Sequence, residues 1–223
     1  VRSHRDIDVM IWPETVYGGL LYESEPEPAL PPPEELGGMS EAEFRAALPA
    51  AVRESRRAME QLAADLRTAL ILGAETQFFG KTGRRFYNSA VFIVKEPATK
   101  AVHENGDETA ISPSLGATAA GFRYRYAGRF DKMHLVMFGE YVPFADRIPW
   151  LQGFTPLSRS TTPGQAAAVF EIKGIRFSPN ICFESAVPQA VGNQVRQLKA
   201  RSQEPDVLVN LTNDGWFWGS SEL

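Results

Sequence analysis

The sequence is poor in the residues from which disulfides and metal sites are built. Among 223 residues it has one cysteine, Cys182, and three histidines, at positions 4, 103 and 134. A single cysteine excludes a disulfide within the chain and a multi-thiolate zinc or iron–sulfur site. The wide spacing of the histidines also argues against a metal site built from them.

The chain also lacks long apolar runs and an excess of positive charge. No segment of the sequence approaches the roughly 18 to 20 consecutive apolar residues of a membrane-spanning helix. Lys plus Arg total 23 and Asp plus Glu total 27, which gives a net charge of −4. We expect no nucleic-acid partner, because such a chain has no basic footprint. The aromatic and basic residues at 122–130 therefore predict a strand with a solvated face.

The composition is otherwise that of a folded domain, with 43% hydrophobic and 22% charged residues. We expect one domain over residues 1–223, with loop insertions near 24–38 and 96–120, where Pro, Gly, Glu or Ala accumulate. The chain begins at Val1 rather than Met and stops soon after an aromatic segment. We therefore expect it to be part of a longer protein, so the lack of a membrane segment in this chain says nothing about the rest of that protein.

The pattern of apolar residues predicts a mixed sheet with helices packed on it, the α/β class. A long helix is expected to begin after Ser40, because Glu43 completes a capping box. A second helix is predicted over 187–201, with Pro188 in its first turn. Strands are predicted over 9–12, 69–73, 89–95, 122–130, 168–172, 175–177, 180–184 and 206–211. Lys173 and Gly174 predict a hairpin turn between the strands at 168–172 and 175–177.

Three reactive side chains stand at or near the ends of predicted strands: Glu14, Lys132 and Cys182. Each also has an ordinary structural interpretation, as a turn carboxylate, a surface charge and a small buried apolar residue. Together, a thiol, a carboxylate and an ammonium suffice for acyl transfer. The thiolate attacks, the carboxylate moves the proton, and the ammonium stabilises the oxyanion.

Six segments that contain these residues occur in a recognisable order. They are IWPET at 11–15, LILGAE at 70–75, YNSAVFI at 87–93, GRFDKMHLVMFGEYVPF at 128–144, PNICFES at 179–185 and LVNLTNDGWF at 208–217. With these segments the chain resembles the nitrilase (carbon–nitrogen hydrolase) superfamily, and in the fourth segment it resembles the lipoprotein N-acyltransferase branch. The resemblance implies a nitrilase-like α-β-β-α sandwich with mixed sheets, incomplete at both ends of the chain.

The resemblance also implies roles for individual residues. Glu14 is the expected general base, Lys132 the stabiliser of thiolate and oxyanion, and Cys182 the nucleophile. Glu140 and Glu184 are expected to support them. In the strand predicted over 180–184, Glu184 points to the same face as Cys182 and can therefore reach the site. Pairing with a nearby Arg or Lys is the alternative for Glu184.

Four further residues are expected to shape the substrate pocket: Phe183, Asn213, Trp216 and Phe217, with Asp214 in the same segment. Phe183 stands where the family usually has tyrosine, so a hydrogen bond through that hydroxyl is lost. The apolar stretch 136–154 has two interpretations, lipid contact or core packing.

The implied reaction moves a fatty acyl chain from a phospholipid, through a cysteine thioester, to the N-terminal amine of a diacylglyceryl lipoprotein. The implied partners are the phospholipid donor, the apolipoprotein acceptor and the membrane, which would be reached through segments outside this chain. No metal or other cofactor is implied. The implied location is the bacterial inner membrane, with the catalytic domain facing the periplasm. Two alternatives stay open: a soluble amidase that hydrolyses a small amide, and an inactive binding protein of the same fold.

Overall fold

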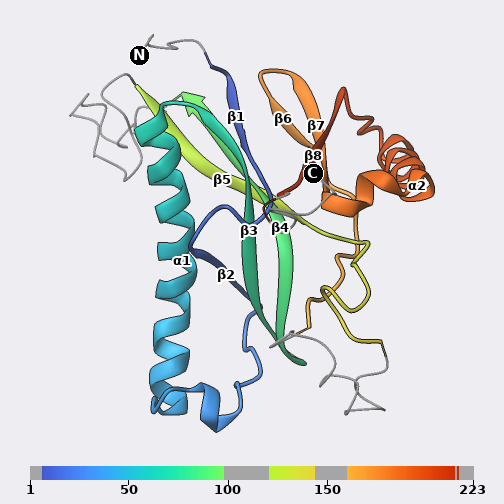
Figure 1. Ribbon diagram of the computed structural model, residues 1–223. Coiled ribbons are helices and arrows are strands. Elements are labelled where there is room, and N and C mark those ends of the chain that lie inside the picture. The colour runs from blue at the N-terminus through green and yellow to red at the C-terminus, as the bar shows by residue number, and fades with distance from the viewer. Residues whose placement is uncertain (1–6, 98–120, 144–159, 214, 216–223) are drawn as a thin grey trace.

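The computed structural model describes residues 7–97, 121–143, 160–213 and 215 (Figure 1). The elements in chain order are β1 Val9–Trp12, β2 Leu20–Ser24, η1 Pro33–Glu35, α1 Glu41–Leu66, β3 Ala69–Gly80, β4 Gly83–Pro97, β5 Phe122–Asp131, β6 Phe170–Ile172, β7 Ile175–Ile181, η3 Cys182–Ala186, α2 Pro188–Ala200 and β8 Val207–Leu211. They form two sheets and two long helices, so the predicted α/β class is confirmed.

Strand β3 is the centre of the larger, five-stranded sheet. Strands β1 and β2 both pair with it in parallel, β1 along 69–72 and β2 along 75–79. On its other side β3 pairs with β4, and β4 pairs with β5, both antiparallel. Because β1 and β5 point their C-terminal ends toward the middle of the sheet, residues that follow these strands can meet there.

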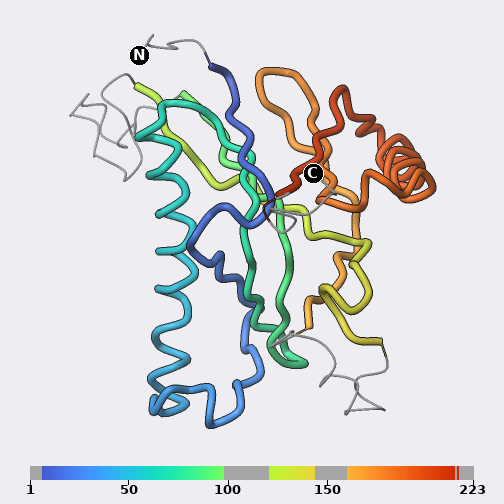
Figure 2. The backbone as a smooth tube through the Cα atoms, in the orientation of Figure 1, coloured from blue at the N-terminus to red at the C-terminus, as the bar shows by residue number. Residues whose placement is uncertain are grey.

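The smaller sheet, β6-β7-β8, packs face to face with the larger one (Figure 2). Phe92 of β4 and Phe170 of β6 stack with ring centroids 3.7 Å apart, and Ile181 and Leu211 are fully or almost fully buried in the same core. Gly128 makes room for this contact, because a Cβ atom there would lie 2.9 Å from the Phe170 ring. Aromatic pairs of this kind add about 0.5–1.5 kcal/mol beyond the area that they bury.

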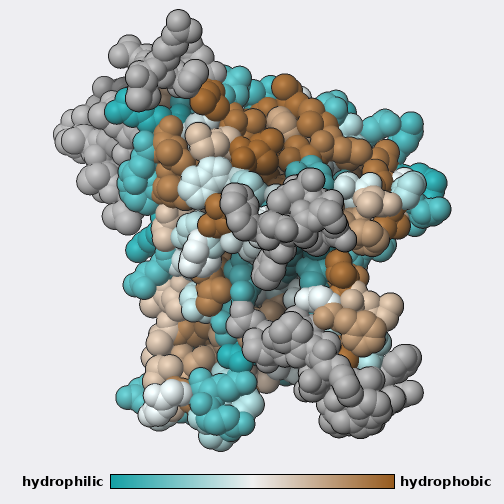
Figure 3. All heavy atoms as spheres, viewed as in Figure 1, coloured by the Kyte–Doolittle hydropathy of each residue, from teal (hydrophilic) through white to brown (hydrophobic). Residues whose placement is uncertain are grey.

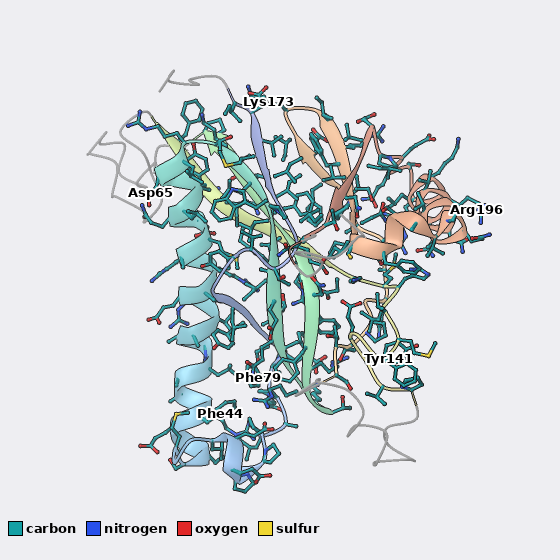
Figure 4. All side chains as sticks on the ribbon, in the orientation of Figure 1. Phe44, Asp65, Phe79, Tyr141, Lys173 and Arg196 are labelled. Carbon is teal, nitrogen blue, oxygen red and sulfur yellow. The ribbon has the colours of Figure 1, made fainter. Side chains whose placement is uncertain are left out.

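Helix α1 covers the other face of the larger sheet. Its start is the predicted capping box, in which the Ser40 side chain accepts from the Glu43 backbone and Glu43 accepts in return. Met59 and Ala63 are completely buried against the sheet. In the first turn of the helix, Phe44 packs edge-on against Phe79 of β3, with ring centroids 5.5 Å apart (Figure 4).

Helix α2 covers the outer face of the smaller sheet. Gln194 is buried and reaches β7, where its Nε2 donates to Ser178 Oγ at 2.6 Å and to the Pro179 carbonyl at 2.9 Å. Asn180 of β7 donates back to the Gln194 Oε1. The layers are therefore α1, larger sheet, smaller sheet and α2, which is the predicted α-β-β-α arrangement.

Two details of the predicted elements are wrong. Strand β2 was not expected, since Leu20–Ser24 is short and runs into the Pro-rich loop. The strand predicted over 180–184 ends at Ile181, where the chain turns into η3. The predicted turn at Lys173 and Gly174 is confirmed, because both residues have positive φ and join β6 to β7.

Apolar surface gathers on the upper part of the face shown in Figure 3, over β1 and the smaller sheet. Ile11, Ile175 and Leu208 are among the exposed side chains of these strands. Within the described ranges, no helix combines the length and the apolar character needed to cross a membrane.

Candidate active site

Glu14 lies in a tight turn directly after β1 and is 7% exposed. The next residue, Thr15, has a φ of 50°, which is a strained value for a non-glycine residue. Gly73 of β3 lies against this turn, and a Cβ atom on it would lie 2.3 Å from the Pro13 carbonyl oxygen and 2.6 Å from Glu14 Cα. The turn can approach β3 so closely only because Gly73 has no side chain.

Lys132 follows the last residue of β5 and is only 1% exposed. Its ammonium nitrogen lies 2.9 Å from Glu140 Oε2, 3.0 Å from Glu140 Oε1 and 3.5 Å from Glu14 Oε1. Burial acts to lower the pKa of Lys132, but the hydrogen bond and charge of Glu140 and the charge of Glu14 outweigh it. The pKa therefore lies above its ordinary value, and Lys132 is a charged ammonium.

Glu140 reaches Lys132 from the loop that follows β5. The Val136 backbone N–H donates to Glu140 Oε2 at 2.8 Å, and the Glu140 N–H donates back to the Val136 carbonyl at 2.8 Å. The Glu140 carbonyl in turn accepts from the Thr161 N–H at 2.8 Å. The carboxylate is thus fixed from both ends, and it neutralises an ammonium whose burial alone would be costly.

Cys182 is the first residue of η3, directly after β7, and it has a φ of 53°. Burial raises the pKa of its thiol, and the negative charge of Glu14 raises it further. Lys132, the Thr212 hydroxyl and the Phe183 backbone N–H act in the opposite direction without cancelling the rise. The charges of Glu14 and Lys132 therefore both act on Cys182, and the thiol is protonated at rest.

Glu184 differs from its expected placement, because residues 182–186 form a 3-10 helix and not a strand. Its carboxylate is 1% exposed. It accepts hydrogen bonds from the backbone N–H groups of Met133 at 2.7 Å, His134 at 3.0 Å and Ile181 at 2.8 Å. Among the described residues, Glu184 is held by these backbone bonds, with the His134 Nδ1 atom 3.7 Å from its Oε1, and not by an Arg or Lys. Glu184 thus ties the turn at Cys182 to the segment that follows Lys132.

The predicted pocket residues are only partly described. Phe183 is 53% exposed beside Cys182. Asn213 Nδ2 makes a long contact of 3.4 Å with the Glu14 carbonyl, and its Oδ1 accepts from the Gly215 N–H at 3.0 Å. Asp214, Trp216 and Phe217 lie outside the described residues.

Two residues near the candidate site were given no role by the sequence reasoning. Asn88 of β4 contacts both Glu14 and Glu140, and Thr212 hydrogen-bonds the thiol of Cys182. Both lie inside segments that resemble the family, YNSAVFI and LVNLTNDGWF. Their location in these segments was the only signal in the sequence. Asparagine and threonine side chains are not ionisable, so neither stood out as a candidate acid, base or nucleophile.

Comparison with known proteins identifies one family. The sequence model of the family described as carbon–nitrogen hydrolase matches residues 1–222. Among curated proteins, the chain is similar to apolipoprotein N-acyltransferases of three bacteria. Identity is 37% over 97 residues for Rhodopirellula baltica, 38% over 112 for Verminephrobacter eiseniae and 39% over 94 for Geobacter metallireducens. These matches cover 43%, 48% and 42% of this chain but only 17%, 18% and 17% of the relatives.

Similar solved structures are more distant. A glutamine-dependent NAD+ synthetase from Acinetobacter baumannii has a TM-score of 0.42 and 18% identity, covering 94% of this chain and 26% of that one. A C145A mutant of an amidase from Nesterenkonia AN1, of the nitrilase superfamily, has a TM-score of 0.42 and 16% identity, covering 94% and 53%.

Proposed function

Because the chain belongs to the carbon–nitrogen hydrolase family, we propose that it carries the active site of an apolipoprotein N-acyltransferase. In this proposal it transfers a fatty acyl chain from a phospholipid to the N-terminal amine of a diacylglyceryl lipoprotein. The curated relatives support this choice by their names, although the chain spans less than a fifth of their length. The enzyme would act at the bacterial inner membrane, with this domain on the periplasmic side.

One observation carries the proposal. A buried ammonium, Lys132, lies between two carboxylates, Glu14 and Glu140, and the charges of Glu14 and Lys132 both act on the thiol of Cys182. Buried charges are costly unless paired, so a protein keeps such a group where it serves a purpose. A base, a cation and a thiol within electrostatic reach of one another are the set that covalent acyl transfer needs.

In the first half-reaction, the Cys182 thiol passes its proton to the Glu14 carboxylate while sulfur attacks the ester carbonyl of the phospholipid. A carbon–sulfur bond forms and the ester carbon–oxygen bond breaks. Glu14 then gives the proton to the departing lysophospholipid oxygen. We assign Lys132 and the Phe183 backbone N–H, which both act on the Cys182 thiol, as donors to the oxyanion. One such donor typically contributes a factor of about 10²–10³.

In the second half-reaction, the amine of the lipoprotein attacks the thioester carbonyl. A carbon–nitrogen bond forms, the carbon–sulfur bond breaks, and the amine proton passes through Glu14 to the departing thiolate. The raised pKa of the Cys182 thiol makes its sulfur a poorer leaving group, so the proton from Glu14 is needed as the carbon–sulfur bond breaks. The same carboxylate thus acts as base and acid in each half-reaction.

Exposed apolar side chains flank the candidate site and support a lipid substrate. Val136, Met137 and Phe138 are 38%, 54% and 50% exposed on the loop that holds Glu140. Phe138 has a φ of 63°, in the left-handed region. The remainder of the expected lipid-contact stretch, 144–154, lies outside the described residues.

This surface yields a direct prediction. We expect the paired change Met137→Ser and Phe138→Ser to weaken binding of the complete protein to phospholipid vesicles, because less apolar area enters the lipid. Vesicle co-sedimentation measures the effect. The matched control is Ile175→Ser with Leu208→Ser, two exposed apolar residues on the smaller sheet. Equal loss in both pairs would contradict a specific lipid contact of the loop.

The test of the proposed reaction uses the complete protein and a phospholipid with a labelled acyl chain. Mass spectrometry of the peptide that contains Cys182 should show a hydroxylamine-sensitive acyl adduct in the wild type and none in Cys182→Ser. Ammonia release from simple amides without the adduct would favour an amidase. Neither signal would favour an inactive binding protein.

A further inference from the structure

Asn88 of β4 lies between the two carboxylates of the candidate site. Its Nδ2 donates to Glu14 Oε1 at 2.6 Å and to Glu140 Oε1 at 3.3 Å. Its backbone carbonyl accepts from the Lys132 N–H at 2.8 Å. Asn88 therefore contacts both carboxylates and the backbone of the residue whose ammonium they share.

The orientation of the Asn88 amide is fixed by this environment. If the amide were rotated by half a turn, its Oδ1 would face two carboxylate oxygens, and all three atoms are acceptors. In the observed orientation, Oδ1 is buried and has no hydrogen-bond partner in the part of the chain that the structure describes. A buried acceptor without a partner lowers the stability of the fold. The two hydrogen bonds from Nδ2 to the carboxylates must compensate for this unpaired oxygen. An asparagine with only a packing role would have no such compensation.

The hydrogen bond from Asn88 leaves the two carboxylate oxygens of Glu14 in different environments. Its Oε1 accepts from Asn88 and lies 3.5 Å from the Lys132 ammonium. Among the residues that the structure describes, the hydrogen bonds and ion pairs of the Glu14 carboxylate all engage Oε1, so Oε2 keeps its lone pairs for a proton. A carboxylate held through one oxygen presents the other in a defined direction.

We propose that Asn88 is a positioning residue for the proton transfer between Cys182 and Glu14. Its amide holds Oε1 of Glu14, so that Oε2 is the oxygen that takes the thiol proton. The second bond, to Glu140, keeps both carboxylates at the separation that the Lys132 ammonium bridges. This inference rests on the proposed function, because it assigns Glu14 as the base.

The sharpest test is Asn88→Asp, which keeps the shape of the side chain and replaces two donors by a carboxylate. We expect the rate of Cys182 acylation in the complete protein to fall about 100-fold at neutral pH, as for other misplaced catalytic groups. The amount of phospholipid needed for half-maximal rate should change little. The acid limb of the pH–rate profile should move to higher pH, because a third carboxylate and a lost donor both favour protonated Glu14.

The matched control is Asn180→Asp. Asn180 is also a buried asparagine that donates to a neighbour, but it faces Gln194 of α2 and not the carboxylates. We expect this variant to lower the thermal midpoint while the acid limb stays in place. If Asn88→Asp shows the same pattern as Asn180→Asp, with no shift of the acid limb, the positioning role is wrong.

Two further variants keep the result decisive. If Asn88→Asp does not fold, Asn88→Ala takes its place; it removes the donors without adding charge, and a shift in the same direction but of smaller size is expected. An unshifted acid limb in Asn88→Ala would overturn the inference. Cys182→Ser separates the two claims: if it is acylated like the wild type, the proposed function itself fails, whatever the Asn88 variants show.

Discussion

Strands β1 and β5 lead into charged side chains that hold one another, whereas β7 leads into a turn that is held through its backbone. In the first region, Glu14, Lys132 and Glu140 form ion pairs around a buried ammonium. In the second, Glu184 accepts three backbone N–H groups and contacts no Lys or Arg among the described residues. Substitutions in the first region should therefore change the charge of the candidate site and the rate of Cys182 acylation. Substitutions in the second region should change the geometry of the turn and the stability of the fold.

The largest effect is expected from Glu14→Gln. The glutamine oxygen can still accept from Asn88, and Lys132 keeps Glu140, so the fold should persist. The base is lost, and the acylation rate of Cys182 should fall by about 10²–10⁴. Single-turnover acylation, followed by mass spectrometry, measures this rate.

Glu23→Gln is the control for Glu14→Gln. Glu23 of β2 also pairs with a cation, Arg56 of α1, but on the face of the sheet that α1 covers. We expect this variant to keep its acylation rate. A comparable loss of rate in both variants would mean that removal of any paired carboxylate, and not loss of the base, is responsible.

The next largest effect is expected from Glu184→Ala, which should destabilise the turn at Cys182. It leaves the Met133, His134 and Ile181 N–H groups without their acceptor. An unsatisfied buried donor costs about 1–3 kcal/mol, and only the bond from Ile181 is fully buried, so stability should fall by about 1–3 kcal/mol. Thermal unfolding measures the loss. A midpoint equal to that of the wild type would show that Glu184 does not hold the turn.

A smaller effect on stability should come from Asp131, the residue before Lys132. Asp131 makes no ion pair with Glu14, Lys132 or Glu140 among the described residues, and pairs with Arg129. Burial raises its pKa above the ordinary 3.8, more than Arg129 and Ser89 lower it. The folded protein thus binds this proton more tightly than the unfolded chain does. The contribution of Asp131 to the free energy of unfolding is full below pH 3.8 and is lost as pH rises through the folded pKa.

Asp131→Asn tests that sign. The unfolding free energy of the wild type minus that of the variant should decrease as the pH rises from about 4 to about 7, because only the wild type loses the contribution of the bound proton. Thermal or urea unfolding across this range provides the measurement. A difference that is constant with pH would mean that Asp131 does not carry the raised pKa. It would also weaken the distinction between carboxylates that affect the acylation rate and carboxylates that affect stability.

The sequence was sufficient to predict the elements whose causes are local. Ser40 and Glu43 mark the start of α1 because a capping box needs only four consecutive residues. Gly174 marks the β6–β7 turn because its φ of 79° suits glycine. The four-layer arrangement was implied by the family resemblance, and the contacts of Met59 and Gln194 with the two sheets agree with it.

What the sequence could not supply depends on contacts between distant segments. Apolar alternation predicted a strand through position 184, but the carboxylate of Glu184 bonds to Ile181 and to residues 50 positions away, and the chain turns at Cys182. Asn88 reads as an ordinary strand residue until β1 and the loop after β5 bring Glu14 and Glu140 to it. The assignment of catalytic roles stays a prediction.

The central claim is that the two sheets bring the thiol of Cys182 within electrostatic reach of Glu14 and Lys132. The most direct measurement is the pKa of that thiol, from the pH dependence of alkylation of the peptide that contains Cys182, in the complete protein. The wild-type pKa should lie above that of a free cysteine. Glu14→Gln should lower it and Lys132→Met should raise it, since the two charges act in opposite directions. The same thiol pKa in all three proteins would contradict the account.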